Sequence, residues 1–205
     1  MASSKAALAL LGILSSIGLM SPMFADSACA KLQNADAPSL LAYLQGGKEG
    51  LDRDCVLFAI RELGNNRHAA SIKTLVAYLD VRLPDPRNLG TRERPIIIAR
   101  IVPPGGLYAA SIALSQIGQA AVPDLLEVIA NASTSELVRD NAADTLFTIY
   151  RAQPQAIVAI VSAAHARTAP MDSLRLMDQA RRLASLCIPG DRNECENAVL
   201  RWPKP

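Results

Sequence analysis

Four cysteines are the residues whose chemistry is easiest to assign. Their even number, and the lack of any Cys-x-x-Cys spacing, favour disulfide bonds over a zinc site or a thioredoxin-like redox motif. Four cysteines allow three pairings, and buried, reduced thiols are the alternative. The cysteines are Cys29, Cys55, Cys187 and Cys195.

The other polar residues do not form a recognisable catalytic set. His68 and His165 are the only histidines, and neither has a second histidine at metal-ligand spacing. Asp52 and Asp54 stand at the start of an expected helix, where capping accounts for them. The acidic stretch 191–196 lacks the glycine and the register of an EF-hand loop, and no phosphate loop or nucleophile elbow occurs. We therefore expect no catalytic, cofactor-binding or metal-binding residues.

Arginines gather in residues 81–106, a segment with five prolines and three glycines that cannot form a continuous helix. A guanidinium group can bind carboxylate or phosphate through two hydrogen bonds, and loops that interrupt a rigid scaffold often carry its function. The alternative is a solvated loop whose arginines pair with acidic neighbours. The candidate partner-binding residues are Arg82, Arg87, Arg92, Arg94 and Arg100, opposed by Asp85 and Glu93, which leaves a local charge of +3.

Helical periodicity predicts the elements that hold these residues. Val122, Leu125, Leu126 and Ile129 have the i, i+3, i+4, i+7 spacing of one helix face, and Gly118 closes the apolar helix before them. The same template begins at residues 37, 72 and 157, and the steps of 35, 50 and 35 residues indicate a repeat of about 35 residues with one insertion of about 15. The helices expected from this pattern span about 37–46, 52–64, 68–80, 109–117, 121–131, 136–150, 154–165, 171–186 and 191–200.

Three short stretches carry a resemblance to a known family. They are Arg61-Glu62-Leu63-Gly64, the run from Ala110 to Gly118 with Ala121-Val122-Pro123-Asp124-Leu125-Leu126, and Val138-Arg139-Asp140-Asn141-Ala142-Ala143. The chain resembles HEAT-repeat proteins, of the short kind related to bilin-lyase HEAT-like repeats, over roughly residues 36–188. The resemblance implies an all-α, armadillo-like helical fold: an α-solenoid of about four stacked helix pairs. It also implies a protein-binding role and supplies no catalytic residues.

Such a stack predicts how the helices and the cysteines are arranged. The second helices of successive pairs, 68–80, 121–131 and 154–165, should lie side by side in one row. Both ends of a stack lack a neighbour to cover the core. We therefore favour the pairings Cys29–Cys55 and Cys187–Cys195, each of which would fasten one end.

The N-terminus predicts export. Residues 1–25 combine Lys5, a short apolar run and a final alanine, as a secretory signal peptide does. A membrane-anchoring helix is the alternative, although the run is short for a hydrocarbon core about 30 Å thick. We expect residues 26–205 to form one domain, secreted or periplasmic, with no stable membrane insertion after signal cleavage. The formal charge of +2 is too small to indicate nucleic-acid binding.

These observations favour an exported, non-enzymatic protein-binding or scaffold module. The HEAT-like resemblance implies that its concave surface is lined by the second helices, with Asp80, Glu127 and Gln155 nearby. One alternative is a lyase or other enzyme related to bilin-lyase HEAT-like proteins, which a deep cleft with histidines or paired carboxylates would support. The other is a protein that binds an anionic envelope polymer or lipid through the arginine-rich insertion, with steep salt dependence.

If both bridges form, the mature protein has no free thiol. Thiol titration of the unfolded protein without reductant should give less than one thiol per chain, and four after reduction. Two or more thiols before reduction would contradict the pairing.

Overall fold

A computed structural model describes residues 29–84, 107–187 and 190–200, and these form an all-α structure. The β-bridge recorded among them is isolated and antiparallel, and it joins Arg82 to Tyr108. The predicted signal peptide, 1–25, and the apolar run expected to be strand-like, 96–102, lie outside the described residues.

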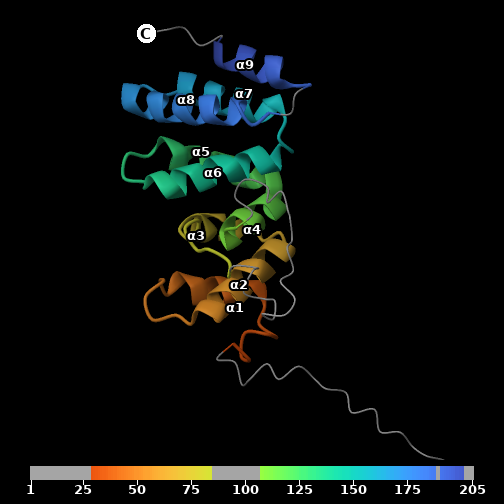
Figure 1. Ribbon diagram of the computed structural model, residues 1–205. Coiled ribbons are helices and arrows are strands. Elements are labelled where there is room, and N and C mark those ends of the chain that lie inside the picture. The colour runs from red at the N-terminus through yellow and green to blue at the C-terminus, as the bar shows by residue number, and fades with distance from the viewer. Residues whose placement is uncertain (1–28, 85–106, 188–189, 201–205) are drawn as a thin grey trace, which may run out of the picture.

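The helices follow the predicted order (Figure 1). Their bounds are α1 Ala37–Gln45, α2 Arg53–Asn65, α3 Ile72–Val76, α4 Ala109–Ile117, α5 Val122–Ala130, α6 Glu136–Ile149, α7 Pro154–His165, α8 Pro170–Ala184 and α9 Arg192–Leu200. Two 3₁₀ turns, Ala69–Ser71 and Gly118–Ala121, lead into α3 and α5.

The third predicted helix, 68–80, is wrong at its end, because α3 stops at Val76. The next residues form tighter turns, in which the amides of Tyr78 and Leu79 bond to carbonyls three residues back. This path buries both side chains, and the Tyr78 hydroxyl donates to the Leu44 carbonyl of α1 at 2.6 Å. A tertiary contact therefore replaces the last turn of the helix.

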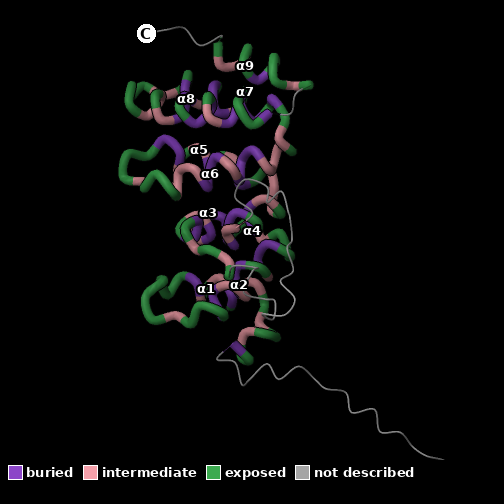
Figure 2. The backbone as a smooth tube through the Cα atoms, viewed as in Figure 1, coloured by how far each residue is buried: buried purple, intermediate pink, exposed green. Residues whose placement is uncertain are grey.

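The helices pack as layers, with α1 on α2, α3 on α4, α5 on α6 and α7 on α8, and α9 covers the last layer (Figure 1). Along the stack, α1, α3 and α5 form one row, and α2, α4 and α6 form another. Buried residues lie between the layers, and exposed residues fill the connecting loops (Figure 2). One hydrophobic cluster runs from Leu40 in α1 to Cys195 in α9.

The repeated template identifies the core correctly. Eleven positions of its four copies, which begin at residues 37, 72, 122 and 157, are buried, and the others, in α1, α3 and α5, pack against the core. The buried ones are Leu40, Leu44, Ile72, Leu75, Leu79, Leu125, Ile129, Ile157, Ile160, Val161 and Ala164.

The prediction of one continuous row is wrong at its last member. Helix α8 packs on α5, whereas α7 makes its main contacts with α8 and α9. The predicted pairs are regrouped, because α3 and α5 pack on the helices that follow them, α4 and α6, and not on those that precede them. In the fourth layer, α8 takes the place that α1, α3 and α5 have in the layers below. The periodicity could not show this, because both helices of that layer have an apolar face.

A row of polar contacts joins α8 to the third layer. Gln179 donates to Asp140 of α6 at 2.8 Å, and Arg182 donates to Asp144 at 2.7 Å. Arg175, on the same face, donates to the Ala130 carbonyl at the end of α5. Helix α7 carries no charged residue before His165, so it cannot make these contacts. Burial raises the pKa of Asp144, and the nearby Arg182 partly opposes this effect.

Residues 109–130 are long and apolar enough, by composition, to cross a membrane. Gly118 interrupts them with a positive φ of 82° and separates α4 from α5. Each piece has nine residues, so it is about 14 Å long, half of what a bilayer core requires. Leu114, Leu125 and Ile129 are also fully buried in the stack. The two pieces therefore act as core helices in this structure.

Substitution of Gly64 should destabilise the protein, because α2 and α4 touch at this residue. A Cβ there would lie 2.6 Å from the Ala113 Cα. Gly64→Ala should lower the free energy of unfolding by about 1–3 kcal/mol, although alanine favours a helix. Denaturant unfolding measures the change. Gly190→Ala is the control, since its Cβ would meet nothing within 4 Å. Equal stability of the Gly64 variant and the wild type would contradict this close approach.

Arg182→Ala should destabilise the joint between the third and fourth layers by about 1–3 kcal/mol, because it leaves the half-buried Asp144 carboxylate without its cation. An acid whose folded pKa is raised stabilises the protein below its unfolded pKa, and this contribution is lost as pH rises through the folded value. The cost should therefore be larger near pH 7 than near pH 4. Arg181→Ala, which removes an exposed pair with Asp178, should be nearly neutral at both pH values.

Candidate functional site

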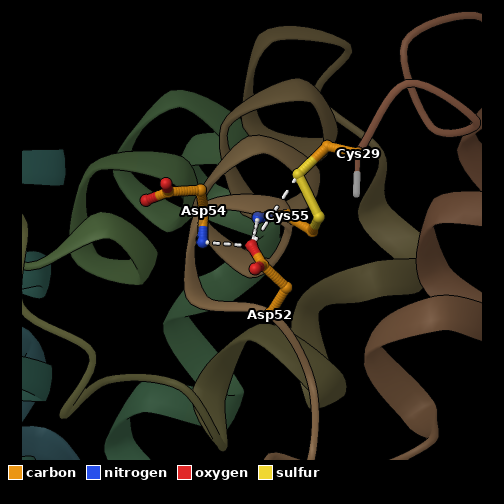
Figure 3. Close-up of a disulfide and its surroundings, with 4 residues drawn as sticks. All are labelled: Cys29, Asp52, Asp54 and Cys55. Carbon is orange, nitrogen blue, oxygen red and sulfur yellow. Dashed lines mark hydrogen bonds between the residues drawn. A yellow bond between two sulfur atoms is a disulfide. The ribbon is translucent and has the colours of Figure 1, made fainter. Parts of the chain in front are cut away.

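The Cys29–Cys55 bridge joins the segment before α1 to the first turn of α2 (Figure 3). Asp52 caps this helix: its Oδ1 accepts the amides of Asp54 at 2.9 Å and Cys55 at 3.1 Å. The capping expected for Asp52 is thus present, and the Cys55 half of the bridge is fixed by a helix start. The Cys187–Cys195 bridge joins the chain after α8 to α9 at the opposite end of the stack (Figure 1).

The same corner contains the group of possible metal-ligand atoms found in the described part of the chain. Cys29, Asp52 and Cys55 present these atoms within 4.8 Å of one another. Both sulfurs are bonded to each other, and the carboxylate accepts two backbone amides. A metal would have to replace all of these interactions, so the corner is structural in its oxidised form.

The candidate arginines are described only in part. Arg82 is exposed beside the bridge to Tyr108, and its carbonyl accepts a 2.9 Å hydrogen bond from Arg53 Nη2. Arg87, Arg92, Arg94 and Arg100 lie outside the described residues.

The polar residues assigned to the concave surface are largely engaged. Asp80 forms an ion pair with Lys48, and Glu127 forms one with Arg167. Gln155 is exposed near the start of α7. His68 and His165 stand at helix ends, as expected: one precedes the turn that leads into α3, and the other ends α7.

A groove of about 910 Å³ lies between α2 and α4, and we call it the α2/α4 groove. On α2 it is lined by Asp54, Leu57, Phe58, Arg61 and Asn65, and on α4 by Ala109, Ile112, Ala113 and Gln116. Cys29, Gln33, Leu83 and Pro84 complete it.

Two features of the sequence create this groove. Helix α2 is apolar on two faces: Ile60 and Leu63 enter the core, while Leu57 and Phe58 stay half-buried on the outer side. Helix α4 offers the small Ala109 and Ala113 between larger residues. Since Gly64 lets the helices touch, the alanines leave a hollow that no larger side chain fills.

The groove has an apolar middle and polar ends. Ile112 is 37% exposed at its wall. Toward one end, the Arg61 guanidinium carbon lies 5.3 Å from the centre of the Phe58 ring, and Arg61 pairs with Glu62. The Gln116 amide donates to Asn65 at 3.4 Å. Asp54 is the one carboxylate that lines the groove, and no histidine lines it. This arrangement suits binding of an apolar group by contact, with polar groups that fix its ends.

The described residues on either side of segment 85–106 lie close to this groove. The Leu83 amide donates to the Leu107 carbonyl at 2.8 Å, and Leu83 and Pro84 line the groove. Leu83 and Pro84, which lie near the start of the predicted insertion, therefore complete the groove wall, although most of the lining residues belong to α2 and α4.

No family model matches the chain, and no curated protein or solved structure matches it significantly.

The groove residues were not predicted from the sequence, because function was assigned to the insertion and to one row of helices. A signal was present in α2. Leu57 and Phe58 extend its apolar surface beyond the stripe needed for the core, and an exposed apolar surface commonly marks a contact site.

Proposed function

We propose that this protein is an exported, non-enzymatic binding or scaffold protein, built as an α-solenoid of HEAT-like helix pairs, that holds a segment of a protein partner in the α2/α4 groove. The observation that carries the proposal is the apolar groove along two neighbouring helices of one row. A rigid stack keeps such a groove open without a partner, which reduces the entropy cost of binding.

The lining supports a peptide or loop as the ligand. Leu57, Phe58 and Ile112 offer apolar contact, while Asn65 and Gln116 can exchange their mutual hydrogen bond for bonds to a partner backbone. Two cysteine pairs at bonding distance agree with an oxidising, extracytoplasmic compartment.

The groove can be tested with a charge placed on its wall. Ile112→Glu should weaken partner binding at least about 10-fold, because a carboxylate there would lose water on contact with an apolar segment. The matched control is Leu174→Glu on α8, where the side chain is similarly exposed, at 43%, and lies outside the groove.

The partner should be captured from the native secreted or envelope fraction by a photocrosslinking amino acid at position 116. The crosslink should be present in the wild-type background, absent with Ile112→Glu and retained with Leu174→Glu. Thermal unfolding should show that both variants fold. Equal capture by the two folded variants would refute the groove as the binding site.

A further inference from the structure

A second cavity, of about 370 Å³, lies near the start of α2 and is distinct in its lining from the α2/α4 groove. We call it the basic pocket. Its lining residues are Lys48, Leu51, Arg53, Val56, Tyr78, Asp80, Val81 and Arg82. Three of these are cations and one is a carboxylate, so the pocket has a formal charge of +2. Its volume falls in the range of small-ligand sites.

The cations come from three different parts of the chain. Lys48 lies in the loop between α1 and α2, Arg53 is the first residue of α2, and Arg82 stands at the bridge to Tyr108. Arg82 lies 29 positions after Arg53 and reaches the other two cations because the first two layers are stacked. The positive charge is thus a product of the fold and not of a local basic run.

Two of the cations are held in place. Lys48 pairs with Asp80 and lies 5.4 Å from the centre of the Tyr78 ring. Arg53 uses one Nη2 hydrogen to bond the Arg82 carbonyl, which leaves other guanidinium donors for a ligand. Such anchoring removes part of the side-chain entropy that an exposed lysine or arginine otherwise loses on binding.

The other acidic side chains near the start of α2 do not line the basic pocket. Asp52 accepts the amides of its own helix start, and Asp54 lines the α2/α4 groove. Glu49 does not line the basic pocket. Within the described residues, Asp80 is therefore the acid that offsets this cluster, and it is already shared with Lys48.

The pocket also has an apolar floor. Val56 and Tyr78 are 6% and 2% exposed, and Leu51 and Val81 pack against the core. Burial raises the pKa of the Tyr78 phenol, whose hydroxyl donates to the Leu44 carbonyl. The ring is therefore a neutral wall beside the cations.

We propose that the basic pocket binds a carboxylate carried on an apolar body, with Arg53 and Arg82 contacting the carboxylate and the floor contacting the body. A planar carboxylate matches the two-donor edge of a guanidinium group. The carboxylate could belong to a free organic acid or to an acidic side chain of a protein. The proposal does not depend on the α2/α4 groove holding a partner.

The test uses the full mature, oxidised protein and follows backbone amide shifts by NMR. The probes are phenylacetate and its neutral isostere phenylacetamide. Phenylacetate should shift the amides of Lys48, Arg53 and Val81 in a saturable way, with a dissociation constant in the millimolar range, and phenylacetamide should bind at least about 10-fold more weakly. Raised salt should weaken the binding of phenylacetate.

The variant Arg53→Gln/Arg82→Gln should abolish the saturable shifts. Arg181→Gln, which changes an exposed arginine at the other end of the stack, should retain them. Equal affinity for the acid and the amide, or unchanged shifts in the double variant, would overturn the proposal. If the double variant fails to fold, the acid and amide comparison in the wild type still decides.

A third probe separates the two sources of the carboxylate. The capped peptide acetyl-Ala-Leu-Glu-Leu-Ala-amide should bind more tightly than phenylacetate if the pocket receives an acidic side chain, and more weakly if it receives a free acid. Both results support the carboxylate site, provided that replacing the peptide's glutamate by glutamine removes binding. Retained binding of the glutamine peptide would count against the proposal.

Discussion

The structure depends on the fact that one pair of short helices cannot bury its own apolar surface. Helices of nine residues, such as α1, α4 and α5, are too short to be stable alone in water. Each pair gains stability only when a neighbouring pair covers it, which explains why the hydrophobic cluster continues through the layers. The ends have a neighbour on one side only. The two disulfides lie there, where they limit the freedom of the unfolded chain.

Close approach between layers follows from small side chains. Gly64 and Ala113 bring α2 and α4 together and leave the hollow beside them. The joint between the third and fourth layers is different, because Gln179 and Arg182 replace part of the apolar contact with hydrogen bonds to Asp140 and Asp144. Charged contacts require a defined geometry, so this joint selects which helix of the last pair meets the third layer.

Much of the fold could be predicted from periodicity. Spacings of three and four residues gave the helices, and the steps of 35 and 50 residues placed the insertion between α3 and α4. The end of α3 could not be predicted, because the Tyr78 contact that shortens it reaches a residue 34 positions away. The exchange of α7 and α8 could not be predicted for a similar reason, because the contacts of α8 with α5 and α6 join residues far apart in the sequence. The basic pocket could not be predicted either, because Arg82 lies beside Lys48 and Arg53 only after folding.

The order of helices in the last layer is the strictest test of this account. Methyl NOE spectroscopy of the mature protein can follow Leu125 and Ile129 of α5 against the apolar residues of the two helices above. The account predicts that α5 shows cross-peaks to Leu176 and Met177 of α8 and few to Ile157 and Ile160 of α7. A regular series of cross-peaks from α5 to α7, without those to α8, would show that the layers repeat without exchange and would contradict the packing described here.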